Sequence, residues 1–155
     1  MKLIKVKQTF YDLCKQHGVD EELLFNENGR PCVLIVSLKY KEKDRNFIVP
    51  LRSNIAPNVP KDQYCSLPPN PKTKPHHHHG VHYIKLFPIH KKFVDKYVVA
   101  GDPYYTNILN ILNRKESTIV QACQDYLDAC ANGNKHIMTP NIDGIIAVLD
   151  NLNSK

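Results

Sequence analysis

The chain has 155 residues and a mass of 17.8 kDa, with 42% hydrophobic and 23% charged residues. This composition is typical of one globular domain covering residues 1–155, and it excludes a disordered chain or a disulfide scaffold. No apolar run approaches the roughly 18 residues that a membrane span needs, and the five cysteines form no Cys-x-x-Cys pair. We therefore expect a cytoplasmic protein with reduced cysteines and no membrane partner.

The first half of the chain is predicted to be rich in strands. Alternating apolar residues over 3–7 indicate a strand, and residues 8–16 follow as a short helix. The β-rich runs 32–40 and 46–51 flank a charged turn, which is typical of a hairpin.

Prolines mark the next boundaries. Pro50 has no amide proton to donate to a sheet, so we expect the sheet to end there, just before Arg52. Residues 54–80 hold six prolines and a histidine run, and they are predicted to be a long irregular loop inside the domain. A third strand is expected over residues 81–89, with Lys85 inside it.

The second half is predicted to be helical. Asp102 before Pro103 and Thr139 before Pro140 are both typical helix starts. Three apolar stripes at helical spacing are predicted core faces, and they comprise Tyr104, Ile108, Leu109, Ile111 and Leu112; Ile119, Cys123, Tyr126, Leu127 and Cys130; and Ile142, Ile145, Ile146, Leu149 and Leu152. Strands followed by helices favour an α+β fold, with the helical C-terminal half packed on a mostly antiparallel sheet.

Positive charge is concentrated in the middle third of the chain. Residues 45–94 carry eight Lys or Arg residues against the single acid Asp62, which gives this segment a net charge of +7. The rest of the chain sums to about −1, so the overall charge of +6 lies in one segment. Such a segment indicates either a polyanionic partner, above all nucleic acid, or simply a solvated face rich in lysine.

The histidine run 76–79 has three possible interpretations. The first is a metal site, which is disfavoured because four consecutive side chains cannot all face one ion and no Cys, Asp or Glu stands at the spacing of a zinc site. A solvated low-complexity loop is the simplest interpretation, and acid–base or phosphate contact by one or two histidines is the other. His82, on the strand expected next, is the best placed for such chemistry. We predict no metal site and no cofactor.

Several enzyme mechanisms lack their motifs. There is no Gly-x-Ser-x-Gly elbow, no glycine-rich phosphate loop and no activating signature beside a cysteine. RNA, in contrast, supplies its own nucleophile, because its 2′-hydroxyl can attack the adjacent phosphate. The protein then has to align the backbone, neutralise charge and move protons. Arg30, the run from Arg52 to Asn54, and His82 have the side chains for these tasks.

At these residues the sequence resembles the type III toxin–antitoxin endoribonucleases of the ToxN/AbiQ superfamily, with their CptN and TenpN relatives. The resemblance follows chain order through Phe10, Arg30, the strand 33–36, the strand and turn 48–53, the strand 85–89, and the helix that begins at Pro103 and Tyr104. The Pro-Leu-Arg-Ser turn at residues 50–53 is its most specific part.

The resemblance implies a compact, strongly twisted antiparallel sheet wrapped by helices. It also implies a metal-independent ribonuclease that selects short sequences and leaves 2′,3′-cyclic phosphate ends. The implied partners are substrate transcripts and a tandem-repeat RNA antitoxin, which is both substrate and inhibitor in ring-like assemblies. Many members of the family act in abortive infection against phage.

Carried over by position, Ser53 matches the essential serine of the family, and Arg30 stands where a lysine is usual. The family's threonine before the serine is Arg52 here, and its lysine two positions after the serine is Ile55. A tyrosine of the family is replaced by Phe10, with Tyr11 adjacent, so either stacking suffices or Tyr11 contacts the phosphate.

We therefore expect Ser53 and Arg52 to bind the scissile phosphate, Arg30 to stabilise charge, and His82, aided by His79, to transfer protons. The residues predicted to bind RNA are Phe10, Tyr11, Asn54, Lys72, Lys74, Lys85, Lys91 and Lys92. Two alternatives are a non-catalytic RNA-binding module, whose basic loop folds on its partner, and a metal-binding protein that uses the histidine run.

Overall fold

The computed structural model describes residues 1–24 and 29–153. It contains a seven-stranded sheet with strand order β4-β5-β3-β2-β1-β7, and β6 pairs with β3 beside this path. Every pairing is antiparallel. The strands are β1 Lys2–Val6, β2 Cys32–Tyr40, β3 Lys43–Ile55, β4 Tyr64–Leu67, β5 His78–His82, β6 Phe87–Pro88 and β7 Val94–Lys96. The predicted α+β class and mostly antiparallel sheet are thus confirmed.

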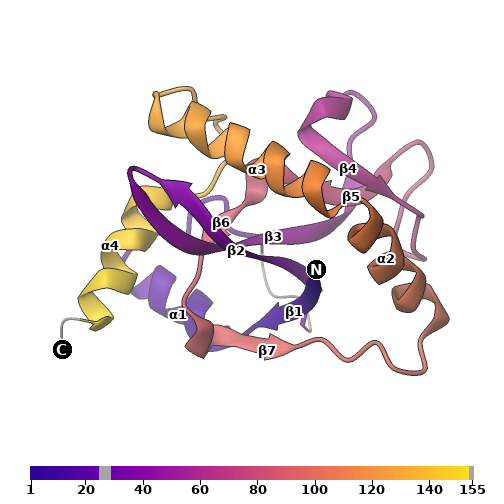
Figure 1. The fold of residues 1–155 in the computed structure, drawn as a ribbon, viewed down its shortest axis with the longest axis horizontal. Coiled ribbons are helices and arrows are strands. Elements are labelled where there is room, and N and C mark those ends of the chain that lie inside the picture. Colours follow the sequence, from indigo (N-terminus) through magenta and orange to yellow (C-terminus); the bar gives the residue numbers. More distant parts are fainter. Residues whose placement is uncertain (25–28, 154–155) are drawn as a thin grey trace.

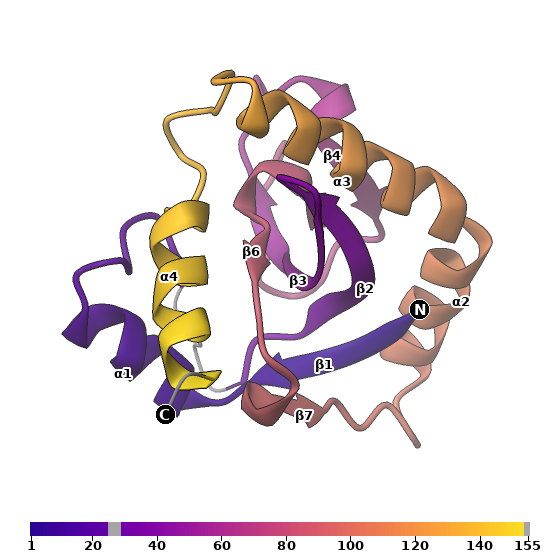
Figure 2. The same cartoon turned by 60° about the vertical axis from the view of Figure 1, so that its left-hand side comes forward.

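Helices cover both faces of this strongly twisted sheet (Figures 1 and 2). The helices are α1 Gln8–Gln16, α2 Pro103–Arg114, α3 Glu116–Ala131 and α4 Ile142–Asn153. One face packs against α2 and α3, and the other packs against α1 and α4. Strand alternation explains the division, because Val33 and Val49 point to the first layer, whereas Cys32 and Ile48 point to the second.

The predicted helical stripes form the core. Ile108 and Leu112 of α2 and Ile119 and Leu127 of α3 are fully buried, as is Ile145 of α4. Burying such a side chain contributes roughly 1.5–3 kcal/mol. No helix among the described residues is long and apolar enough to cross a membrane.

The predicted hairpin of β2 and β3 is confirmed, but the expectation that the sheet ends at Pro50 is wrong. β3 continues to Ile55 and pairs with β5 through Leu51 and Arg52. The amide of Leu51 donates to Pro31 on the β2 side, so the nitrogen of Pro50 faces the opposite edge. At that edge, Pro50 lies between the residues of β3 that pair with β6 and those that pair with β5, so the missing amide proton of Pro50 costs the sheet little stability.

Three further boundaries differ from the predictions. The expected loop 54–80 contains β4 and the start of β5, which form their own antiparallel pair. The expected strand 81–89 is interrupted by a 3-10 turn, Tyr83–Lys85. α4 is capped by Asn141, whose side chain accepts a hydrogen bond from the Gly144 amide, and not by Thr139, whose buried hydroxyl contacts Tyr126.

Candidate active site

The continuation of β3 places Ser53 in a cavity of about 450 Å³. Successive side chains of a strand point to opposite faces, so Leu51 and Ser53 line this cavity, whereas Arg52 does not. Further polar side chains reach the same cavity from other elements, and they are Arg30, Asn70, Lys72, His79, Asp102 and Tyr104. Of the five predicted catalytic residues, three therefore converge here.

A hydrogen-bond network holds the Ser53 hydroxyl. Asn70 donates from Nδ2 to Ser53 Oγ at 2.8 Å. The Asn70 side chain is itself fixed, because its Oδ1 accepts from the Lys72 amide at 2.8 Å and from the Thr73 hydroxyl. Since Ser53 Oγ accepts from Asn70, its own proton is available to donate into the cavity.

The loop after β4 is tied to β3 through Asn54. Its side chain donates to the Lys72 carbonyl at 3.0 Å and accepts from the Lys74 amide at 2.7 Å. Asn54 thus positions the segment that carries Lys72 over the cavity, which is a different task from the RNA contact that we predicted for it.

Arg30 lies at the entry to β2. Its Nη1 donates to the Leu51 carbonyl at 3.0 Å, which holds the guanidinium beside the strand that carries Ser53. The guanidinium is always charged at physiological pH. Arg30 can therefore supply positive charge to the cavity from a fixed position.

His79 is the histidine that reaches the cavity. Its Nδ1 lies 2.8 Å from the Pro68 carbonyl and 3.0 Å from the Tyr104 hydroxyl, which itself donates to that carbonyl. A carbonyl only accepts, so Nδ1 carries the proton and Nε2 has the free lone pair. Burial lowers the pKa of His79, although the bond to Pro68 opposes this effect. The ring is therefore neutral at pH 7.

His82 is placed differently from the prediction. Arg52 donates from Nη1 to His82 Nδ1 at 3.2 Å, so the proton of the neutral ring lies on Nε2. The side chain is only 1% exposed, and Nε2 has no hydrogen-bond partner among the described residues. Burial, together with the nearby charges of Arg52 and Lys85, lowers the pKa of His82 to about 4. Because the ring is buried outside the cavity, it does not reach the place beside Ser53 where we expected it to transfer protons.

Three predicted RNA-binding side chains are buried. Phe10 is 0% exposed and stacks on Phe87 in the core, so the expectation that it stacks on RNA is wrong for this structure. Tyr11 lies beside it in the same cluster. Lys85 is 3% exposed and donates to Glu22 Oε2 at 3.0 Å, so its ammonium is held in an ion pair with a surface carboxylate and does not line a groove.

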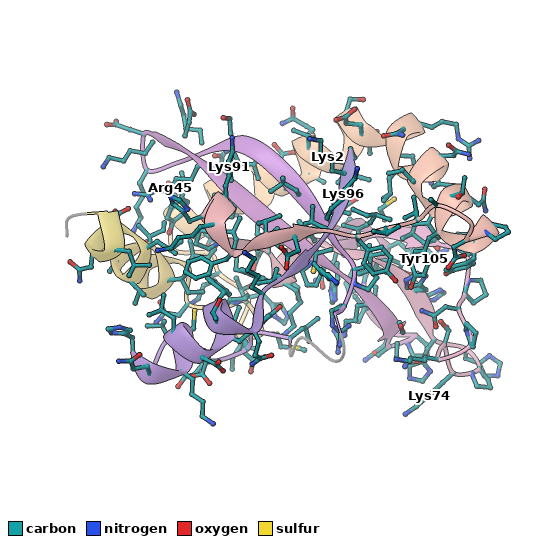
Figure 3. All side chains as sticks on the ribbon, turned by 90° about the horizontal axis from the view of Figure 1, so that it is seen from below. Lys2, Arg45, Lys74, Lys91, Lys96 and Tyr105 are labelled. Atoms are coloured by element: carbon teal, nitrogen blue, oxygen red, sulfur yellow. The ribbon has the colours of Figure 1, made fainter. Side chains whose placement is uncertain are left out.

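The remaining predicted lysines do not form one groove either. Lys72 lines the cavity, and Lys74 follows it in the same loop. Lys91 and Lys92 are exposed on a 3-10 turn before β7. Figure 3 shows Lys91 and Lys74 apart from each other, with Lys91 on the upper side of the view and Lys74 at its lower right. The basic middle third of the sequence thus divides between two surfaces.

The histidine run shows no metal site. Among the described ranges, no three His, Cys, Asp or Glu side chains are placed to hold an ion together. His77 bonds to the Pro75 carbonyl, and His78 stacks on Tyr64.

Sequence reasoning missed Asn70 and the aromatic wall of the cavity. Asn70 follows two prolines, and its Asn-Pro-Lys-Thr turn was the available signal. Tyr104 was assigned to a core face, but it turns its ring toward His79, and Tyr97 and Tyr105 stand beside it on the cavity wall. Only the tertiary arrangement joins these residues.

This architecture, with helices on both faces of a twisted antiparallel sheet, is a ToxN-like fold. The comparison that carries this statement is structural, because no protein-family model and no curated protein matches the sequence.

Two solved structures superpose on nearly the whole chain. One comes from work on bacterial type III toxin–antitoxin systems and selective toxin inhibition by a non-coding RNA pseudoknot. The superposition has a TM-score of 0.74 at 15% sequence identity, and it covers 99% of this chain and 98% of that chain. The other comes from work on a processed non-coding RNA that regulates a bacterial antiviral system; it has a TM-score of 0.70 and 16% identity, over 97% and 98%. The predicted resemblance in fold is confirmed.

Proposed function

We propose that the protein is a metal-independent endoribonuclease toxin of a type III toxin–antitoxin system. The observation that carries the proposal is the convergence of Ser53, Arg30, Lys72 and His79 on one cavity. These groups supply a hydroxyl donor, two cations and a neutral imidazole, which are what RNA transesterification requires. The shared fold supports the assignment, because both solved relatives belong to RNA-regulated bacterial systems.

In the proposed reaction, the 2′-hydroxyl of the RNA attacks the adjacent phosphorus. A bond forms between the 2′ oxygen and phosphorus, and the bond to the 5′ oxygen breaks, which leaves a 2′,3′-cyclic phosphate. The His79 Nε2 lone pair takes the proton of the 2′-hydroxyl, and the departing 5′ oxygen takes a proton from water. The lowered pKa of His79 keeps this lone pair available at neutral pH.

The Ser53 hydroxyl donates to a non-bridging phosphate oxygen. It can do so because Asn70 already occupies its acceptor side at 2.8 Å. Arg30 and Lys72 offset the negative charge that develops on phosphorus in the transition state. Arg52 is not assigned to the phosphate, since it lies on the other face of β3 against His82.

An RNA antitoxin is the proposed inhibitor. One structural relative is inhibited by a non-coding RNA pseudoknot, and the other is regulated by a processed non-coding RNA. We propose that a tandem-repeat RNA is cut by this chain into units that then occupy the cavity, in ring-like protein–RNA assemblies. Such a system would act in the cytoplasm as an antiviral defence by abortive infection.

The decisive experiment compares two serine variants on total cellular RNA. Removing one transition-state donor costs on the order of 100-fold to 1,000-fold in rate, so Ser53→Ala should lose cleavage by at least about 100-fold while it still binds RNA. Ser66→Ala is the matched control, because Ser66 is exposed on β4 and does not line this cavity. EDTA should leave the wild-type rate unchanged.

Two results would contradict the proposal. Wild-type protein that binds RNA but never cuts it would indicate a non-catalytic RNA-binding module. Cleavage that EDTA abolishes would indicate a metal-dependent enzyme instead. Expression in a bacterial host gives a second readout, since wild type and Ser66→Ala should arrest growth and Ser53→Ala should not.

A further inference from the structure

An aromatic wall closes one side of the Ser53 cavity. It consists of Tyr97, which follows β7, and Tyr104 and Tyr105 in the first turn of α2. The Tyr105 ring packs edge-on against both neighbours, with centroids 5.2 Å from Tyr97 and 5.0 Å from Tyr104. All three tyrosines are only partly buried, whereas Ile108 and Leu112 fill the core beneath α2. The wall therefore presents aromatic surface to the cavity.

The wall is suited to contact a polyanion. Burial raises the pKa of both Tyr104 and Tyr105, with the nearby Tyr97 adding to the effect on Tyr105. The phenols stay neutral at any physiological pH and do not repel a phosphate backbone. Neutral tyrosine rings are stacking platforms for nucleobases in proteins that bind single-stranded RNA.

A fixed carboxylate stands beside this wall. Asp102 Oδ1 accepts from the amides of Tyr104 and Tyr105, at 3.0 and 3.2 Å, and so caps α2. No described residue donates to the other oxygen, Oδ2, and Asp102 is exposed at the cavity rim. The capping bonds leave Oδ2 as an oriented acceptor next to the aromatic rings.

We propose that the tyrosine wall and Asp102 form a subsite for the nucleobase next to the scissile phosphate. The base stacks on the wall, and its exocyclic amino group donates to Asp102 Oδ2. The subsite therefore takes adenine, cytosine or guanine and disfavours uracil, which has no amino group and whose N3–H donor lies between two carbonyl oxygens that repel a carboxylate. This inference rests on the proposed function, because it places the base relative to the phosphate at Ser53.

Stacking is tested by a pair of Tyr105 variants. Tyr105→Leu removes the ring and is expected to raise KM for a short RNA by about ten-fold, with kcat much less affected. Tyr105→Phe keeps the ring and should retain the wild-type KM. An RNA with an abasic nucleotide beside the cleavage site should bind to wild type about ten-fold more weakly than the intact RNA does. This abasic RNA should bind with equal affinity to wild type and to Tyr105→Leu.

Base choice is tested by Asp102→Asn. Asparagine caps a helix about as well as aspartate, so Oδ1 keeps its two amide bonds and an amide nitrogen replaces Oδ2. The acceptor becomes a donor, and the cleaved sites in a random RNA pool should shift from amino-bearing bases toward uracil. Thermal unfolding of the variant should match that of wild type within a few degrees.

Binding measurements separate this inference from the proposed function. A short RNA with a 2′-O-methyl group at the cleavage site cannot react, and its affinity reports the subsite alone. If Tyr105→Leu lowers the affinity for the intact RNA ten-fold and leaves the affinity for the abasic RNA unchanged, the subsite is supported even if the protein fails to cut RNA. Equal affinity of wild type and Tyr105→Leu, or an unchanged base preference in Asp102→Asn, would overturn the inference while leaving cleavage at Ser53 intact.

Discussion

His82 should make the stability of the protein depend on pH. Its pKa is about 4 in the folded chain, whereas its ordinary value is 6.5. Above pH 6.5 the ring is neutral in both states, and the folded state keeps its full stability. As the pH falls from 6.5 toward 4, the unfolded chain takes up a proton that the folded chain refuses, so stability is lost.

The expected loss follows from these two values. Each pH unit between them is worth about 1.4 kcal/mol, and the linkage relation gives a loss of about 2.5 kcal/mol between pH 7.5 and pH 4.5. The physical cause is burial beside the cations Arg52 and Lys85, because a charged imidazole there would be desolvated and repelled.

Urea unfolding at the two pH values measures this contribution. The pH-dependent loss in wild type should exceed that in His82→Gln by about 2.5 kcal/mol, since glutamine can still accept from Arg52 and does not titrate. His76→Gln is the control, because His76 is exposed, and the pH dependence of this variant should follow that of wild type. Parallel pH profiles for wild type and His82→Gln would refute the assignment of His82 as a buried neutral residue.

Three other variants test the surrounding structure. Glu22→Gln should destabilise the protein by about 1 kcal/mol in urea unfolding, because the buried Lys85 ammonium loses its carboxylate and keeps the Glu22 carbonyl as an acceptor. Lys85→Met should be nearly neutral, and equal losses for the two variants would contradict this. Gly80→Ala places a Cβ in steric conflict with the Cys65 carbonyl oxygen, so a loss of at least about 2 kcal/mol is expected, and an unchanged Tm would refute that close approach. Asn141→Ala should cost about 1 kcal/mol in the same assay through loss of the α4 cap, and no loss would argue against the cap.

Local patterns predicted most of the fold. The helix Gln8–Gln16 and the hairpin of β2 and β3 follow from periodicity and turn residues, and α2 begins at the predicted cap, Asp102. These features depend on neighbours in the sequence. The prediction that the sheet ends at Pro50 failed because a proline interrupts a sheet only where its nitrogen faces a paired strand. The pairing at that edge is set by β5 and β6, far along the chain.

The site was predictable only in part. Ser53, Arg30 and His79 line one cavity, but treating residues 50–53 as a turn concealed the strand alternation that sends Arg52 to the opposite face. The burial of His82 could not be foreseen either, because it arises from packing against residues distant in sequence. Composition shows where charge lies along a chain, but only the fold decides which charges share a surface.

The account depends most directly on the nucleophile that breaks the RNA. A short RNA that wild-type protein cuts at one position should be remade with a single 2′-deoxy nucleotide on the 5′ side of that bond. We predict that cleavage there stops and that the unmodified RNA yields a 2′,3′-cyclic phosphate end in the presence of EDTA. Continued cleavage of the deoxy-substituted RNA would contradict attack by the 2′-hydroxyl, and with it the assigned roles of Ser53 and His79.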